Sequence, residues 1–214
     1  MAEDRSPAGG KFMERDREAT RTKIIDAVER LAVRDGFESC GVNAISKEAG
    51  VDKVLIYRYF GGLDGLLSAT IAERAAWPAT IEPTTATPSS AGSGLAATLI
   101  EIARDIRARP LAQHAVAWEA TGHADHDTTK PITDGREAAL SALGSALRDA
   151  HAIPPRLDLE AVGALVTAGI TTLATRAAFD VPYFGLDLGQ DKDWRRVEKA
   201  AATILRALLD SSDA

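Results

Sequence analysis

The sequence predicts an all-α protein with a small N-terminal helical domain and a larger C-terminal one. Alanine and leucine recur at intervals of three and four residues, whereas β-branched runs and alternation of apolar and polar residues are scarce. Apolar residues make up 45% of the 214 residues, which is enough to bury a core in each domain. Glycine and proline residues separate the periodic stretches and divide the chain into individual helices.

The composition also limits where the protein works. The single cysteine, Cys40, rules out an intrachain disulfide and favours a reducing cytoplasm, and it fits inert packing better than a redox handle. No apolar stretch approaches the length of a membrane span, and the N-terminus lacks the apolar segment of a signal peptide. We therefore expect a cytoplasmic protein with no membrane partner.

Charge is distributed unevenly along the chain. The net charge is −6, but residues 1–60 hold 11 Lys/Arg and 11 Asp/Glu, so the acidic excess lies in the C-terminal part. Domains that bind nucleic acids are usually basic. If residues 1–60 bind DNA, individual basic side chains rather than a long-range field must supply the attraction.

The first elements follow from local signals. Residues 1–16 are polar and contain Gly and Pro, which predicts a mobile arm. A helix is expected from Arg17 or Thr20 to Asp35, with Gly36 ending it. Its apolar stripe comprises Ile24, Ala27, Val28 and Leu31. Two short helices follow, over residues 42–49 and 52–59.

A tight turn at Gly50 connects these two short helices. Gly50 can adopt the left-handed conformation that ends the first, and Asp52 is placed to cap the second. In the second helix Ile56 faces the core, while an outward stripe of apolar and arginine side chains is unusual for a solvated surface. That stripe comprises Val54, Leu55 and Arg58, with Tyr57 and Tyr59 at its edges. Such a helix suits insertion into the major groove of DNA.

This part of the chain resembles the TetR family of bacterial transcriptional repressors. The resemblance rests on Thr20–Ile25, Gly36–Phe37, Ile45, Ala49–Val51, Tyr57–Phe60 and Leu66–Leu67 in their order and spacing. It implies a helix-turn-helix DNA-binding domain over residues 17–62 and a helical domain for effector binding and dimerisation over residues 63–214. It also implies a homodimeric, ligand-responsive repressor that binds a palindromic operator in double-stranded DNA and is released by a small effector.

The expected DNA contacts lie on and beside the second short helix. They are Lys53, Val54, Leu55, Tyr57, Arg58, Tyr59, Lys47 and Thr22. Lys53 and Arg58 suit phosphate or guanine. Val54 and Leu55 suit contact with thymine methyl groups or, alternatively, packing within the domain. The resemblance implies that both tyrosines hold backbone phosphates.

The remaining chain contains further helical patterns. Helices are expected over residues 63–77, 95–109, 111–121, 134–151, 158–179 and 192–209, with connections at 78–94, 123–133 and 180–190. The last two helices are apolar over more than one stripe. The resemblance implies that they pair with those of a second subunit as a four-helix bundle, although a broad core within one chain would give the same pattern.

The resemblance also implies an effector cavity in the helical domain. Its candidate lining residues are His114, Trp118, Thr121, Thr171, Leu99, Ile102, Leu143, Leu147 and Val166. A mostly apolar wall favours a hydrophobic or aromatic small molecule. Each of these residues would equally suit an ordinary core.

Two other functions fit parts of the sequence. His123 and His126 stand three apart among carboxylates and could bind a divalent metal in a hydrolase, but no third, distant ligand is evident. The fold could also serve as a protein-interaction scaffold that binds no DNA. Because phosphate-binding loops and nucleophile motifs are missing from the sequence, we expect no catalytic residue and no cofactor.

Overall fold

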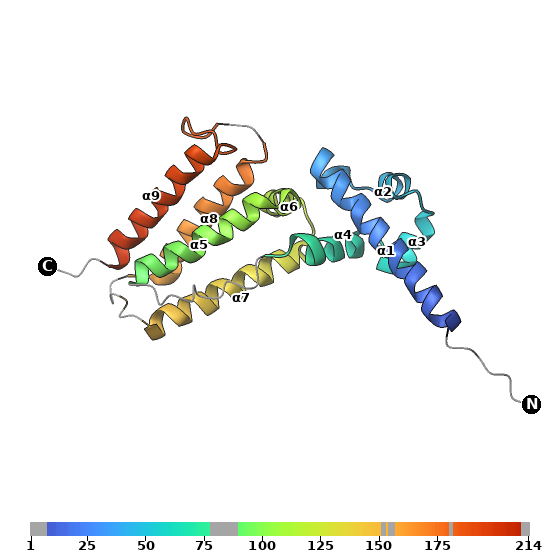
Figure 1. Cartoon of the computed structure of the whole chain (residues 1–214), viewed down its shortest axis with the longest axis horizontal. Helices are drawn as coiled ribbons and strands as arrows, with labels where there is room; N and C mark the ends of the chain where they lie inside the picture. The colour runs from blue at the N-terminus through green and yellow to red at the C-terminus, as the bar shows by residue number, and fades with distance from the viewer. Residues whose placement is uncertain (1–7, 78–89, 151–152, 154–156, 180–181, 211–214) are drawn as a thin grey trace, which may run out of the picture.

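The computed structural model describes residues 8–77, 90–150, 153, 157–179 and 182–210, and helices dominate this part of the chain (Figure 1). The α-helices are α1 (Ala8–Asp35), α2 (Val42–Ala49), α3 (Lys53–Phe60), α4 (Leu63–Thr70), α5 (Ala91–Ala108), α6 (Pro110–Ala120), α7 (His126–Ala150), α8 (Leu159–Arg176) and α9 (Asp191–Leu209). A 3₁₀ turn, η1 (Phe37–Ser39), precedes α2, and a π-helical turn, η2 (Ile71–Ala75), continues α4. The described residues contain no β-strand, only an isolated bridge between Tyr183 and Leu186. The all-α prediction is confirmed.

Helices α1 to α4 form one unit, which we call the head. α1 packs against α2 and α4, and α3 packs between α2 and α4. The most deeply buried side chains at its centre are Ile24, Val28, Ile45, Ile56 and Leu66. Gly36, which follows α1, has φ 83°, a positive value that favours glycine, and Phe37 after it folds back into the core.

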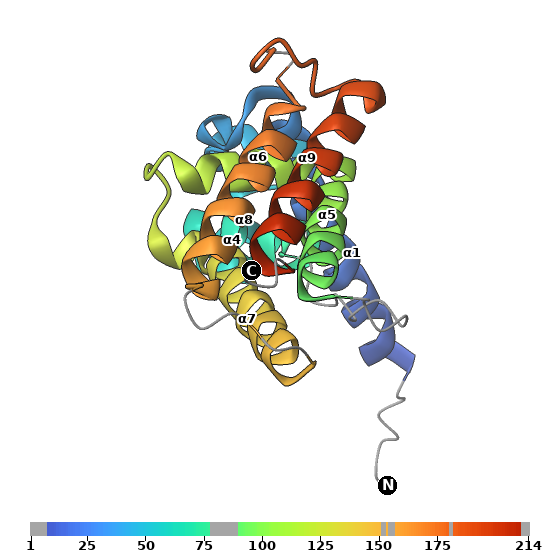
Figure 2. The same ribbon diagram turned by 90° about the vertical axis from the view of Figure 1, so that its left-hand side faces the viewer.

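Helices α5 to α9 form a bundle, which we call the body, with α5 at its centre. α5 packs against α8 and α9 and also contacts α6 and α7 (Figure 2). Gly92 permits the close approach of α5 to α9, because a Cβ there would lie 2.7 Å from the Arg206 Cα. Farther along, the Arg104 guanidinium donates to both carboxylate oxygens of Glu198 at 2.6 and 2.7 Å. This bidentate pair fixes the register of α5 on α9.

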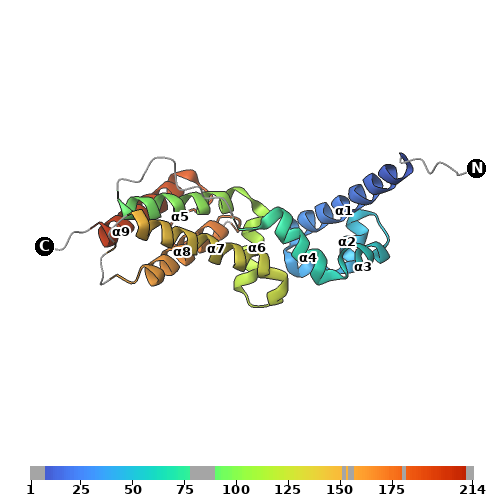
Figure 3. The same cartoon turned by 90° about the horizontal axis from the view of Figure 1, so that it is seen from below.

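Head and body lie at opposite ends of an elongated molecule (Figure 3). α4 and η2 lead from the head to the body and pack against α7, and η2 also packs against α6. Trp77, which follows η2, is buried beside Gly135 of α7. A second contact joins the Phe37 ring of the head to the Trp118 ring of α6, stacked with centroids 4.9 Å apart. The two units are therefore in direct apolar contact.

Two predicted boundaries in the N-terminal half are wrong. α1 begins at Ala8, so residues 8–16 of the expected arm are helical, while residues 1–7 lie outside the described residues. α5 begins at Ala91 because Ser90 caps it by accepting the N–H of Ser93. Residues 78–89 of the expected connection lie outside the described residues.

A third boundary fails in the C-terminal half, where α7 begins at His126 inside the expected loop. Pro131 lacks the N–H that continues a helix, which hides the helical pattern in the sequence. Asp125 nevertheless caps the start by accepting the N–H of Asp127 at 3.0 Å, and Ile132 is fully buried. The cap and the burial of Ile132 thus stabilise the helix despite the hydrogen bond that Pro131 cannot donate. None of the helices in the described part of the chain is both long and apolar enough to cross a bilayer.

Candidate nucleic-acid interface

The turn between α2 and α3 has the geometry that the sequence predicts. Gly50 is left-handed, with φ 61° and ψ 42°, and its N–H bonds to the end of α2. Asp52 caps α3 by accepting the N–H of Val54 at 2.8 Å. The Ser46 hydroxyl donates to the Val51 carbonyl at 2.6 Å and closes the turn from the other side. Ile56 is fully buried, so the core fixes the rotation of α3 about its axis.

With Ile56 inward, α3 turns a mixed face to solvent. This α3 face consists of Lys53, Val54, Tyr57 and Arg58, all exposed, with Val54 61% and Tyr57 56% accessible. Leu55 differs from the expectation, because it is half-buried and packs against the core of the head. An apolar and a phenolic side chain held this far out beside two cations form a surface that suits base edges and phosphates.

Tyr59 lies at the edge of this surface and is half-buried. Its ring packs edge-on against Phe60, with centroids 6.5 Å apart, and the Arg17 guanidinium lies over it at 5.6 Å. Of the remaining predicted contacts, Lys47 is exposed in the last turn of α2, and Thr22 is half-buried on α1.

Two groups of basic side chains in the head differ in whether they have ionic partners. Arg21, Arg30, Arg34 and Arg74 pair with Glu73, Glu48, Asp35 and Asp26. Lys23, Lys47, Lys53 and Arg58 are exposed and form no hydrogen bond or ion pair through their side chains with any described residue. The unpaired group lies on and beside the helix-turn-helix. The head has no net charge, yet these four cations without ionic partners lie at or beside this surface.

A second surface lies on the outer side of α8 and α9. Leu165 is 76% exposed, Ile204 52% and Leu208 41%. Leu165 and Ile204 line a shallow groove that also includes Val166 and the turn at Tyr183 and Phe184. We call this apolar surface the α8–α9 face. Exposed apolar area of this kind marks an interaction surface.

The turn beside the α8–α9 face holds its aromatic side chains outward. Tyr183 and Leu186 exchange two backbone hydrogen bonds, each 3.0 Å long, around Phe184 and Gly185. Phe184 has φ 52° and is 95% exposed, while the Arg176 guanidinium lies 4.9 Å over the Tyr183 ring. A bulky residue in the left-handed region is strained, so the backbone at Phe184 is in an unfavourable conformation while its side chain points to solvent.

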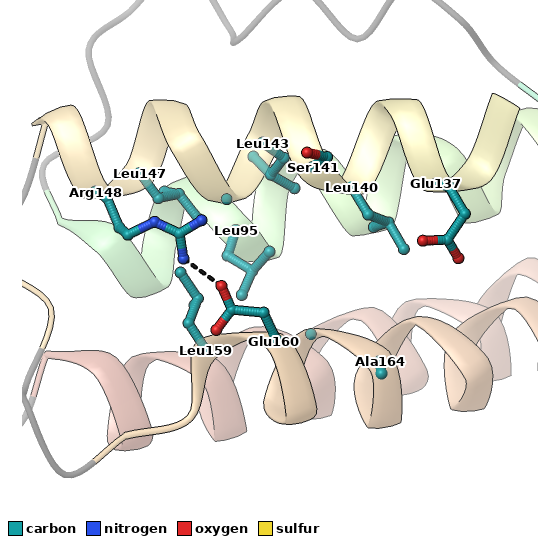
Figure 4. A pocket seen from close by; sticks show the side chains of 12 residues that line it. Leu95, Glu137, Leu140, Ser141, Leu143, Leu147, Arg148, Leu159, Glu160 and Ala164 are labelled. Atoms are coloured by element: carbon teal, nitrogen blue, oxygen red, sulfur yellow. Dashed lines mark hydrogen bonds and ion pairs between the residues drawn. The ribbon is translucent and has the colours of Figure 1, made fainter. Parts of the chain in front are cut away.

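A cavity of about 290 Å³ lies between α7 and α8, with α5 behind it (Figure 4). Five leucines line it: Leu95, Leu140, Leu143, Leu147 and Leu159. At one end the Arg148 side chain donates to Glu160 at 2.5 Å. This hydrogen bond holds the pKa of Glu160 below its ordinary value. Glu137 lies at the other end.

The structure does not gather the nine candidate effector residues around this cavity. Only Leu143 and Leu147 line it. Leu99 and Ile102 are buried in the core around α5, and Val166 lies in the groove of the α8–α9 face. Ordinary core packing explains the first two positions.

The polar and aromatic candidate effector residues also lie outside the lining of this cavity. The buried Thr171 hydroxyl donates to the Thr167 carbonyl at 2.7 Å, and the exposed Thr121 hydroxyl donates to the Trp118 carbonyl at 2.7 Å. The Trp118 ring itself stacks on the head. His114 packs edge-on against Phe179, with centroids 5.2 Å apart, and burial lowers its pKa.

The cavity also contains residues that the sequence analysis did not select. Glu137 and Leu140 come from the first half of α7, and Gly144 and Gly163 stand in the middle of helices. The available signal was a glycine in the interior of each helix, because each glycine removes a side chain from the helix surface. For the metal hypothesis, no group of three or more His, Cys, Asp or Glu side chains suited to a metal ion occurs among the described residues.

Comparisons with known proteins agree with this geometry. Residues 24–70 match the family model described as "Bacterial regulatory proteins, tetR family". The hemolysin II transcriptional regulator HlyIIR has a similar structure, with a TM-score of 0.59 and 15% identity over 92% of this chain and 99% of that one. No curated protein sequence matches this chain.

Two regulators named FadR share the fold as well. The fatty acid degradation regulator from Bacillus halodurans gives a TM-score of 0.62 and 17% identity, over 86% of this chain and 96% of that one. FadR from Bacillus subtilis, solved in complex with stearoyl-CoA, gives 0.62 and 16% over the same shares. At these identities the solved structures show a common fold and no more. The segment that contains the helix-turn-helix, residues 24–70, is thus similar to the TetR family of bacterial regulatory proteins.

Proposed function

We propose that this protein is a homodimeric repressor that binds a palindromic operator through the α3 face of each protomer and is released by a small effector bound in the body. The observation that carries the proposal is the composition of the α3 face. Lys53 and Arg58 are exposed without ionic partners, beside an exposed Tyr57 and Val54. Arg58 suits guanine or phosphate, Lys53 suits phosphate at the helix start, and Val54 suits a thymine methyl group.

The α8–α9 face supports the homodimer. Leu165 and Ile204 are large apolar side chains more than half exposed, and covering them by the same face of a second copy would remove that area from water. An isologous pairing of this kind gives a two-fold axis, which a palindromic operator matches. The two α3 faces must then stand about 34–36 Å apart to enter successive major grooves.

Contacts between head and body support control by an effector. α7 lines the cavity and also packs against α4 and η2, while α6 stacks Trp118 on Phe37. A ligand that spreads α7 and α8 would therefore act on the helix that positions α3. By linkage, an effector that weakens operator binding is itself bound more weakly in the presence of the operator, by the same factor.

Selection from a random duplex pool tests the operator. We expect the purified protein to enrich palindromic sequences whose half-sites are about 10 base pairs apart from centre to centre. Titration of the selected duplex in a mobility-shift assay should show an affinity that falls steeply with salt. Enrichment of no sequence at all would contradict the proposal.

A pair of arginine variants sharpens this test. Arg58→Ala should weaken operator binding at least about tenfold, because one contact is lost in each half-site. Arg30→Ala is the matched control, because Arg30 lies in the same domain but is paired with Glu48 at 2.9 Å. Equal losses of affinity in the two variants would refute the specific role of the α3 face.

A further inference from the structure

The cavity between α7 and α8 is kept open by small residues. Gly144 of α7 and Gly163 and Ala164 of α8 line it, together with five leucines and four polar or charged residues. A Cβ at Gly163 would meet nothing within 4 Å, so no close backbone contact demands glycine there. Glycine inside a helix is less favourable than alanine by about 1 kcal/mol. Neither helix geometry nor packing accounts for Gly163, whereas space for an occupant does.

The charges around this cavity are not balanced. Arg148 and Glu160 neutralise one another at one end through their hydrogen bond. Glu137, at the other end, forms no hydrogen bond or ion pair with any described residue. Its neighbour Arg136 donates to Glu119 at 2.7 and 2.9 Å and interacts with Glu137 through charge attraction without a hydrogen bond. In Figure 4 the Glu137 carboxylate points toward α8, across the cavity.

We propose that this cavity binds an elongated apolar organic cation, an amine whose charge pairs with Glu137 and whose hydrocarbon part lies along the leucines. The leucine wall from Leu140 to Leu147 extends about 10 Å along α7, which suits a medium-length alkyl chain. The exposed Glu137 carboxylate, which accepts no hydrogen bond from a described residue, favours a positive end group and disfavours a carboxylate. Taking this ligand as the effector rests on the proposed function, whereas its binding does not require DNA.

Three ligands of equal chain length test the charge preference. Calorimetric titration of the full chain without DNA at pH 7 would compare n-octylamine, 1-octanol and octanoate. We expect the amine to bind about three- to fivefold more tightly than the alcohol, and octanoate to bind most weakly, as for a partly exposed ion pair. Within the n-alkylamines, each methylene added up to the length of the wall should improve affinity about fourfold.

Two kinds of variant locate the site. Glu137→Gln should remove the preference for octylamine over octanol, while Glu101→Gln, an exposed position on α5 outside the cavity, should leave it unchanged. Gly163→Leu should abolish binding of all three ligands by filling the space. Ala164→Leu is a second filling variant in case Gly163→Leu does not fold, which circular dichroism would reveal.

The outcomes separate the inference from the proposed function. Octanoate binding as tightly as octylamine, an unchanged preference in Glu137→Gln, or unchanged binding in both filling variants would overturn the ligand assignment. A protein that binds its selected operator but no alkylamine would likewise refute this inference alone. If octylamine binds as expected but does not change operator affinity, the site and its ligand class stand, and control by that ligand is refuted.

Discussion

Truncation of Leu165 should weaken the homodimer by an amount that the structure allows us to calculate. Leu165→Ala removes roughly three methylene equivalents, worth about 2.4 kcal/mol when fully buried. In the single chain the side chain is 76% exposed, so most of this transfer remains to be gained at an interface. That fraction is about 1.8 kcal/mol per protomer, and two-fold symmetry doubles it to about 3.6 kcal/mol. The dimer dissociation constant should rise about 400-fold.

Sedimentation velocity over a dilution series would measure this constant. The control is Val33→Ala, which truncates an exposed apolar side chain on α1, away from the α8–α9 face. The control should sediment like the unaltered protein at every concentration. The free energy of unfolding should fall little in Leu165→Ala, because so little of the side chain is buried within one chain. A dissociation constant unchanged in Leu165→Ala, or a monomeric unaltered protein, would refute the assignment of this face.

Three further expectations concern the head and its junction with the body. Tyr57→Phe should lower affinity for the selected operator about fivefold without shifting the urea midpoint, because its exposed hydroxyl is lost as a phosphate donor; an unchanged affinity would exclude that contact. Trp118→Ala removes the ring stacked on Phe37 and should reduce the free energy of unfolding by about 2 kcal/mol, measured in urea, whereas no change would mean that this stack contributes nothing. The hydrogen bond from Arg136 depresses the pKa of Glu119, so its stabilisation is present above the unfolded pKa and is lost as pH falls through the folded pKa. Urea midpoints at pH 7 and pH 4 should therefore differ more in the unaltered protein than in Glu119→Gln, and equal differences would count against the pair.

The helix-turn-helix could be predicted from the sequence because its signals are local. A left-handed glycine at Gly50, a cap at Asp52 and an inward Ile56 are each decided by residues a few positions apart. The burial of Leu55, by contrast, could not be predicted from local signals. Its angular position on an isolated helix is outward, but neighbouring elements of the head cover half of it.

The cavity could not be predicted in the same way, because it depends on how three helices pack. Periodicity identifies apolar faces on α5, α7 and α8 but does not tell which faces meet and which are held apart. Leu99 is therefore expected in the cavity wall but lies in the core, whereas Glu137, an exposed carboxylate that the sequence analysis does not select, borders the cavity. The start of α7 is a related case, since buried Ile132 and a capping Asp125 stabilise a helix through Pro131.

The π-helical turn η2 (Ile71–Ala75) affects the helical segment that joins the head to the body. Before it, Leu66 and Leu67 are buried within the head, and after it Ala75 and Trp77 are buried at the junction with the body. A π turn inserts one residue into the winding and so changes the phase of all that follows by about 100°. The one continuous helical segment thereby buries side chains in the head before the turn and at the junction with the body after it. Because a regular α-helix would set a different angle between these two sets of side chains, any rewinding of this turn would rotate the head relative to the body.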